Sequence, residues 1–340
     1  MRQLAFAVRR LGMSLLVLIG LSVITFTLAR VIPSDPAAAY IGPHPRPEQV
    51  AMVRARLGLD RPLPVQYLVY VRDLLRGDWG NSISTKRPVL QEIGDRIAAS
   101  LELLICGMAL AVLIGVPLGV LSARFQGSPF DLFVRTLSIA GVSMPAFWLG
   151  LILQLLFFRV LRLLPLTGRF STELRFTHPI QVHTGFFLVD CLLTGNWVAL
   201  KDVAWHLVLP AFTLAAYPIG LIARMTRGTM LEVLAQDYIR TARAYGISER
   251  FVVYGYALKN AIGPTLTVIG LTLAYALTGT FFIEIVFNWP GLGQFTVHSL
   301  LSVDYPAIMG VTLLAAAGYV GINLIVDLVQ AWIDPRISLR

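Results

Sequence analysis

The sequence has few charged residues: Asp, Glu, Lys and Arg make up 14% of its 340 residues, whereas 56% are hydrophobic. Mean hydropathy is +0.72, far above the usual value for a soluble domain of this length. Period-2 alternation of apolar and polar residues is also lacking, which excludes a membrane β-barrel. We therefore expect an all-α polytopic membrane protein that forms a single domain over residues 1–340.

Motifs for nucleotide, metal or thiol chemistry are missing as well. The sequence has no Gly-x-x-x-x-Gly-Lys-Ser/Thr loop for phosphates, no His-Glu-x-x-His and no Cys-x-x-Cys. Cys106 and Cys191 are expected at different depths, so we expect no disulfide. The five histidines are dispersed: His44, His178, His183, His206 and His298. We expect no catalytic residue, no cofactor and no metal site in this chain, so uphill transport would need an ion gradient or another subunit.

Six apolar runs are close to the length of roughly 20 residues with which a helix crosses a hydrocarbon core of about 30 Å. Pro145 is expected to kink the third run, and Pro210 and Pro218 blur the ends of the short fourth run. Gly115-x-x-x-Gly119 predicts close helix packing in the second run. The expected spans are residues 11–31, 100–121, 134–161, 207–222, 262–285 and 308–331.

Lys and Arg near the span ends predict the orientation, because short cytoplasmic loops carry an excess of them. They place both termini and a polar loop at 224–261 in the cytoplasm. Segments 32–99 and 163–206 then lie outside. The first contains helix-like stretches at 48–57 and 65–75, and the apolar run 186–193 in the second is too short to cross.

The net charge of +9 does not indicate nucleic-acid binding, because the basic residues are spread along the cytoplasmic rims and one outer segment. Anionic phospholipid of the surrounding bilayer is the expected counter-charge.

Acidic residues within the apolar spans are few. Glu102, Glu284 and Asp327 are all expected near an interface, where helix-end or inter-subunit polar contacts explain them. An ion-coupled secondary carrier would place such groups near the bilayer midplane. This argues against ion coupling, which stays as an alternative, beside a receptor or a passive channel subunit.

The polar loop contains a short helical run at 238–245, which Gly246 is well placed to end. Arg240 and Arg243 are three residues apart and share one face, while Ala242 and Ala244 keep the helix slim. Such a slim, basic helix suits docking on a soluble partner. The alternative is an ordinary solvated cytoplasmic loop.

The run Asp237-Tyr-Ile-Arg-Thr-Ala-Arg-Ala-Tyr-Gly246, followed by Lys259-Asn260-Ala261 and Pro264, resembles the EAA loop of permease subunits in binding-protein-dependent ABC importers. With Arg224-Met-Thr-Arg-Gly-Thr-Met-Leu-Glu-Val-Leu234 before it, the chain resembles the dipeptide/oligopeptide permeases. Where the general pattern has Glu-Ala-Ala, this chain has Arg240-Thr241-Ala242. Further matches are Ile32-Pro33-x-Asp35-Pro36, Gly77-Asp78-x-Gly80-x-Ser82, Ser100-Leu-Glu-Leu103, Asn288-Trp-Pro-Gly-Leu-Gly293 and Asp334-Pro-Arg336.

The resemblance implies the six-helix permease fold of type I importers, working by alternating access in a bacterial inner membrane. The implied partners are a second homologous permease subunit, two cytoplasmic ABC ATPases that bind ATP and Mg, and an outer solute-binding protein. An outer gate or docking surface would include Glu284, Trp289, Pro290 and Gly291. The implied ATPase-coupling residues are Tyr238, Arg240, Thr241, Ala242, Arg243, Ala244 and Gly246. Short peptides are the expected cargo, with nickel chelates, glutathione and sugars as alternatives.

Overall fold

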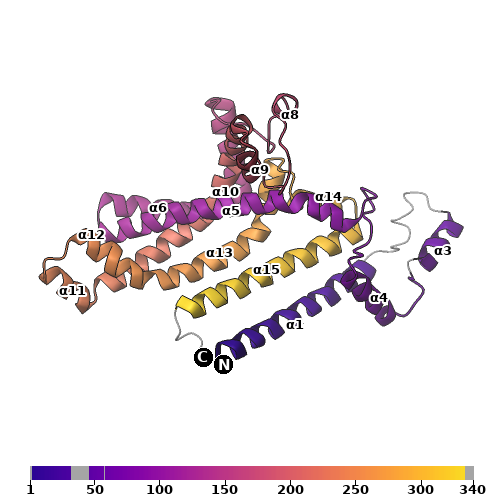
Figure 1. Ribbon diagram of the computed structural model, residues 1–340, viewed down its shortest axis with the longest axis horizontal. Coiled ribbons are helices and arrows are strands. Elements are labelled where there is room, and N and C mark those ends of the chain that lie inside the picture. Colours follow the sequence, from indigo (N-terminus) through magenta and orange to yellow (C-terminus); the bar gives the residue numbers. More distant parts are fainter. Residues whose placement is uncertain (1, 32–45, 57, 334–340) are drawn as a thin grey trace.

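The computed structural model describes residues 2–31, 46–56 and 58–333, and these residues form a helical bundle (Figure 1). The helices of the first half are α1 (Arg2–Val31), α3 (Pro47–Arg56), α4 (Leu63–Leu75), α5 (Val89–Arg124), α6 (Pro129–Ser143), α7 (Ala146–Gln154) and the π-helix η1 (Leu155–Val160). Those of the second half are α8 (Leu174–Thr177), α9 (Phe187–Thr194), α10 (Trp197–Leu234), α11 (Asp237–Ala244), α12 (Glu249–Phe251), the π-helix η2 (Val252–Ala257), α13 (Leu258–Val286), α14 (Leu292–Leu301) and α15 (Tyr305–Ile333).

The predicted all-α membrane fold is confirmed. In the described part of the chain, five helical stretches are long and apolar enough to cross a membrane, and a bent pair brings the number to six if it counts as one span. The five stretches lie in α1, α5, α10, the run from α12 through η2 into α13, and α15. The helices expected at 48–57, 65–75 and 186–193 are observed as α3, α4 and α9, although residue 57 lies outside the described residues.

The third predicted span, 134–161, is not one continuous helix. α6 ends at Ser143, α7 begins at Ala146, and the two are bent by 107° with respect to each other. Met144 has extended backbone angles (φ −84°, ψ 131°), as expected for a residue before proline. Pro145, which lacks a backbone N–H, therefore breaks the helix where the sequence indicated only a kink.

Other helices extend beyond their predicted spans, and α5 and α10 do so by the most residues. α5 begins at Val89 rather than at residue 100, and α10 runs from Trp197 to Leu234 rather than over 207–222. Polar residues at the start of α5 belong to the helix because ion pairs join Glu92 to Arg87 and Arg96. Part of each predicted outer segment, and of the predicted loop at 224–261, is thus helix.

The core of the bundle is the interface between α5 and α10. A side chain at Gly119 would place its Cβ 2.6 Å from the carbonyl oxygen of Ala223, and one at Gly115 would lie 3.0 Å from Ile222. Only glycine allows so close an approach between two helices. The packing role predicted for Gly115 and Gly119 is therefore confirmed.

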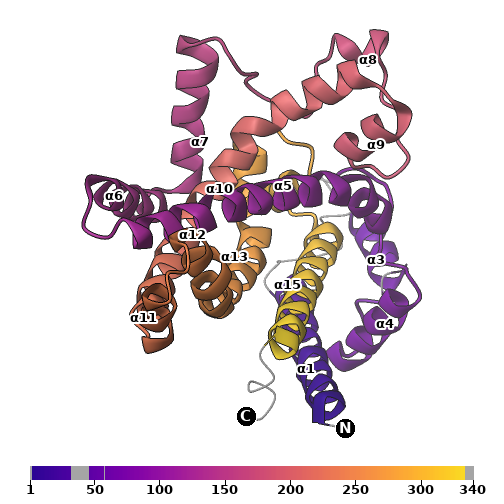
Figure 2. The same ribbon diagram turned by 60° about the vertical axis from the view of Figure 1, so that its left-hand side comes forward.

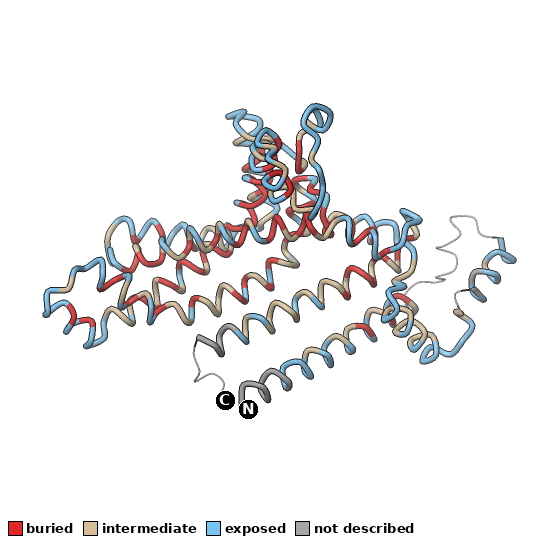
Figure 3. The backbone as a smooth tube through the Cα atoms, in the orientation of Figure 1, coloured by how far each residue is buried: buried red, intermediate tan, exposed pale blue. Residues whose placement is uncertain are grey.

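α11 and α12 lie together at one end of the bundle, called here the α11 end, whereas α3, α4 and α14 lie at the other, the α14 end (Figures 1 and 2). α1 and α15 run side by side, and an ion pair of 2.9 Å joins Arg10 to Asp327. Buried residues concentrate along α5, α10 and α13, whereas α1 is largely exposed (Figure 3). The apolar side chains of α1 are therefore free to face lipid or another subunit.

Candidate functional site

The site begins with α11, a short helix that packs on its own chain through one face. Ile239 and Ala242, three residues apart, are 0% and 8% exposed. Such spacing buries one stripe of a helix and leaves the opposite stripe in solvent. Their buried neighbours come from the ends of four other elements: Val120, Ala123, Met230, Val252, Val253, Ala257 and Ala261. α11 is thus seated on the meeting point of α5, α10, η2 and α13.

Backbone geometry ends α11 as the sequence predicts. Gly246 is in the left-handed region, with φ +72°. The N–H of Gly246 donates to the carbonyl of Arg243 at 3.0 Å, and the N–H of Ile247 donates to that of Ala242 at 3.2 Å. These two bonds form a Schellman motif, and Ile247 completes it by packing on the cluster beneath α11. The chain therefore turns away at Gly246.

The solvent-facing stripe of α11 carries most of the predicted coupling residues: Tyr238, Arg240, Thr241, Arg243 and Ala244. Tyr245, at the end of the helix, is 83% exposed and was not among the predicted coupling residues. Ala242 was, but its buried side chain faces the chain itself, so it cannot be part of a contact surface. An exposed aromatic residue beside arginines is typical of a protein interface.

Polar contacts hold this surface in place. The Arg243 guanidinium donates two hydrogen bonds to the Glu249 carboxylate, at 2.8 and 3.1 Å, and these raise the pKa of Arg243. Asn260 on α13 donates to the hydroxyl of Tyr238 at 3.1 Å. Arg240 lies 3.4 Å from Asp237 and its side chain is 72% exposed. Arg240 is therefore the more available of the two predicted arginines.

A buried carboxylate fixes the adjoining end of α10. Asp131 at the start of α6 accepts two hydrogen bonds from the guanidinium of Arg227, at 2.7 and 2.9 Å. It also accepts one from Ser122 Oγ at 2.5 Å and one from the N–H of Gly127 at 3.0 Å. Bidentate, charge-assisted bonds of this kind are strong and directional. These bonds connect α5, α6 and α10 through one buried carboxylate.

We expect Gly246→Ala to destabilise the end of α11 by about 1 kcal/mol, because an L-residue is strained in the left-handed region. Hydrogen exchange of the amides of residues 237–247 should become faster. Gly228→Ala in α10 is the control, because nothing lies within 4 Å of its added Cβ and its backbone is helical. Equal exchange in both variants would contradict the assigned role of Gly246.

The residues predicted for an outer gate or docking surface are found mostly inside the chain. Trp289 and Glu284 are both 0% exposed, Gly291 is buried, and of the predicted four only Pro290 is exposed. Glu284 accepts hydrogen bonds from Ser100 Oγ at 2.6 Å and from the N–H of Gly293 at 2.7 Å. These residues cannot present a docking surface as they stand.

Hydrogen bonds of Trp289 and of Ser100, the partner of Glu284, join two parts of the chain. A role in an outer gate stays a prediction. The indole N–H of Trp289 donates to the carbonyl of Ala99 at 2.9 Å, and the Ser100 hydroxyl accepts from the N–H of Leu292 at 2.8 Å. The segment between α13 and α14 is thereby fastened to α5. Because every polar group involved is paired inside the chain, this cluster stabilises the α14 end.

A second buried cluster at this end was missed by sequence reasoning. Arg169 donates to the Glu102 carboxylate at 2.6 and 2.9 Å and to the carbonyl of Gly185 at 2.6 Å. Its guanidinium carbon lies 3.7 Å from the centre of the Phe187 ring. Glu102 also accepts from the N–H of Leu188 at 2.8 Å. The pair fastens the segment between η1 and α10 to α5.

In the described residues there is no group of three or more His, Cys, Asp or Glu side chains that could hold a metal ion. His44 lies outside those residues. Both cysteines are free thiols: Cys191 is buried, and Cys106 is partly exposed on α5.

Two family models match the chain. Residues 115–339 match "Binding-protein-dependent transport system inner membrane component", and residues 3–104 match the N-terminal model of such membrane components.

The chain is 47% identical over 323 residues to the probable D,D-dipeptide transport system permease protein DdpB of Escherichia coli, covering 95% of this chain and 94% of that protein. It is 42% identical over 335 residues to the dipeptide transport system permease protein DppB of Alkalihalophilus pseudofirmus, covering 98% and 99%. It is 42% identical over 335 residues to the di/tripeptide transport system permease protein DppB of Pseudomonas aeruginosa, covering 98% of each chain.

Proposed function

The chain belongs to the binding-protein-dependent transport system inner membrane components, and from this membership we propose that it is the permease subunit of an ATP-driven importer of dipeptides or short oligopeptides. The cargo is proposed from the printed names of three relatives, which are dipeptide or di/tripeptide permeases. The alternative cargoes, which were nickel chelates, glutathione and sugars, are not favoured by these names.

Energy reaches the permease through α11. ATP and Mg are bound by two cytoplasmic ATPase subunits, and the exposed stripe of α11 docks on one of them. The single observation that carries this proposal is the division of α11 into a buried face and an exposed face. The buried face ties α11 to the long helices through Ile239, and the exposed face offers Tyr245 and Arg240. A helix built in this way transmits motion of a docked partner to the bundle.

The α11 end is then cytoplasmic, together with both chain termini. The α14 end faces outward, where a solute-binding protein delivers the cargo. α1, whose apolar side chains are largely exposed, is available to contact a second, homologous permease subunit. The two permease subunits together form the pathway, and alternating access opens it to each side in turn.

Reconstitution tests the proposal. Proteoliposomes that contain both permease subunits, both ATPases and the solute-binding protein should take up a labelled dipeptide only when ATP is present. Collapsing the proton and sodium gradients should leave uptake unchanged. Uptake that needs a gradient and proceeds without nucleotide would instead favour the ion-coupled carrier.

A further inference from the structure

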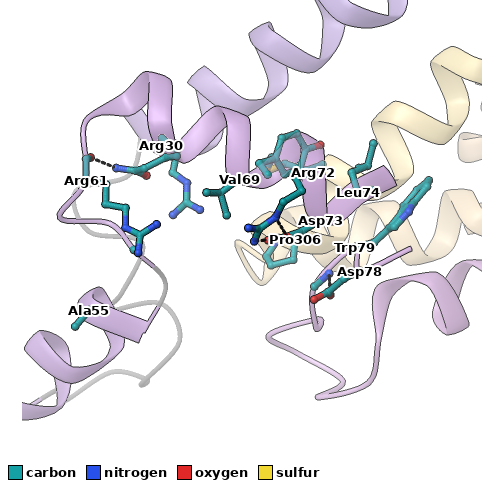
Figure 4. Close-up of a pocket in the computed structure, with 16 residues that line it drawn as sticks. Arg30, Ala55, Arg61, Val69, Arg72, Asp73, Leu74, Asp78, Trp79 and Pro306 are labelled. Carbon is teal, nitrogen blue, oxygen red and sulfur yellow. Dashed lines mark hydrogen bonds and ion pairs between the residues drawn. The ribbon is translucent and has the colours of Figure 1, made fainter. Parts of the chain in front are cut away.

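α13 has one stripe of side chains that the rest of the described chain leaves largely exposed. Leu271, Tyr275 and Phe282, spaced four and seven residues apart, are 56%, 63% and 62% exposed. Such spacing places all three on one face of the helix. The stripe carries no charged residue, in contrast to the polar cavity of about 480 Å³ between α1, α4 and the start of α15, which arginine and aspartate side chains line (Figure 4).

The other faces of α13 are covered by this chain. α15 packs on one of them, where a Cβ added at Gly270 would collide with Val326. α5 and α10 cover another, where Ala276 and Ile283 belong to the same buried cluster as side chains of those two helices. The exposed stripe is therefore the part of α13 that remains for a ligand or for another subunit.

Two further aromatic residues, from α10 and α7, extend this stripe. The rings of Tyr217 and Tyr275 have centroids 5.7 Å apart and are tilted by 37°. Phe147, in the first turn of α7, lies beside Phe282, with ring centroids 6.5 Å apart. The bend of 107° between α6 and α7 sets the direction of α7. These four residues, from three helices, are called here the aromatic face.

The two tyrosines of the aromatic face carry hydroxyl groups within the membrane-spanning part of the bundle. Tyr275 lies near the centre of the expected span 262–285, and Tyr217 lies inside the expected span 207–222. Tyrosines that anchor a protein at the membrane surface lie at the ends of spans. Hydrocarbon offers a hydroxyl no hydrogen bond, and in the described part of the chain the Tyr217 hydroxyl has no hydrogen-bond partner. The aromatic face therefore suits water or a polar ligand better than lipid.

A short peptide has groups that match this face. Its amide N–H and C=O groups can pair with tyrosine hydroxyls, which both donate and accept hydrogen bonds. Its terminal ammonium group is attracted to the face of an aromatic ring. Its apolar side chains can pack on Phe147 and Phe282. The first two contacts involve groups that every dipeptide has, so they do not depend on which side chains the peptide carries.

We propose that the aromatic face lines the pathway between the two permease subunits and binds the cargo peptide during its passage. This rests on the proposed function, because it takes the cargo to be a short peptide. The hydroxyls of Tyr217 and Tyr275 form hydrogen bonds with the peptide amides. The ring of Tyr275, the most exposed of the four, contacts the terminal ammonium group.

The first test measures access to Tyr275 in the assembled importer in proteoliposomes, in a background of Cys106→Ala and Cys191→Ala. Tyr275→Cys should react with a charged methanethiosulfonate reagent, which modifies cysteines that water reaches. A large excess of dialanine should slow this reaction several-fold. Tyr319→Cys is the matched control, because Tyr319 is a 44% exposed tyrosine of α15 outside the aromatic face. Dialanine should leave the reaction of Tyr319→Cys unchanged.

The second test measures ATP-driven uptake of dialanine. Tyr217→Phe/Tyr275→Phe keeps both rings and should lower the uptake rate about five-fold, which is the effect of losing a hydrogen bond. Tyr217→Ala/Tyr275→Ala should lower the rate roughly ten-fold or more, because the ring contacts are lost as well. Tyr319→Ala should transport like the wild type. The ATPase should co-purify with every variant, which shows that each importer is assembled.

The proposal would be overturned if Tyr275→Cys did not react, or if dialanine left its reaction unchanged. Wild-type uptake by the alanine double variant, or an equal loss in Tyr319→Ala, would also overturn it. If the wild type imports dialanine with ATP and the aromatic face fails these tests, the peptide site is rejected and the proposed function stands. If the wild type needs no ATP, the proposed function is rejected, whereas protection of Tyr275→Cys by dialanine would still support the site.

Discussion

Replacing Tyr245 by alanine is expected to weaken the association of this chain with its ATPase by about 30-fold, since truncating an aromatic hot spot costs about 2 kcal/mol or more. Tyr245 is 83% exposed at the end of α11, beside Gly246, where a partner can cover the whole ring. Ile239 and Ala242, which seat α11 on the bundle, stay in place in the variant. The loss should therefore come from the contact and not from the fold.

The measurement is co-purification of the ATPase with the permease, followed by titration of purified ATPase onto the permease in nanodiscs. Phe176→Ala is the matched control, because Phe176 on α8 is 84% exposed but lies away from the α11 end. It should bind the ATPase like the wild type. An equal affinity of Tyr245→Ala and wild type would remove Tyr245 from the docking surface.

Arg169→Met is expected to have the largest effect on stability. It leaves the Glu102 carboxylate, which is 3% exposed, buried without its cation, and breaking a buried pair in this way costs roughly 3–5 kcal/mol. The variant also lacks the stacking of the guanidinium on Phe187 and its hydrogen bond to the carbonyl of Gly185. The segment between η1 and α10 should detach from α5 before the bundle itself unfolds.

Limited proteolysis of the assembled importer measures this effect, with cleavage within residues 163–196 expected to become much faster. The double variant Glu102→Gln/Arg169→Met should recover most of the resistance, because residue 102 then carries no charge that needs a cation. Arg175→Met, at an exposed position on α8, is the control and should resemble the wild type. If the double variant were as labile as Arg169→Met, packing and not charge would explain the loss.

Local patterns predicted where most helices lie and where α11 ends, because the causes of both are local. Apolar runs long enough to span are visible in composition alone, and a glycine placed after a short helical run predicts a left-handed end such as Gly246. The packing of Gly115 and Gly119 was equally predictable, since the spacing of small residues on one helix face decides how close a second helix comes.

Burial of polar residues was not predictable, because it depends on partners far away in the sequence. Glu284 and Trp289 were expected in an outer gate or docking surface. Both are buried against Ser100 and Ala99 on α5, so they form no docking surface, and their part in a gate stays a prediction. No role was predicted for Arg169, because its burial depends on the ion pair with Glu102, which is distant in the sequence. A proline can either kink or break a helix, and the sequence did not show that Pro145 breaks it.

The sequence also did not show which face of α11 is exposed to solvent. From the sequence alone, each of the four residues from Arg240 to Arg243 could belong to the surface of a docking helix. Only the packing of α11 on α5, α10 and η2 shows that Ala242 faces inward while Thr241 faces solvent. Adjacent residues on one helix therefore have opposite roles.

Thr241 and Ala242 give the most direct test of the central claim, which is that the exposed face of α11 docks on the ATPase. Thr241→Cys and Ala242→Cys are made separately in the assembled importer and treated with a short bifunctional thiol reagent, using ATPase subunits with a cysteine introduced in their permease-facing groove. Thr241→Cys should cross-link to the ATPase and Ala242→Cys should not. Cross-linking of neither variant, or labelling of Thr241→Cys from outside intact cells, would contradict the account.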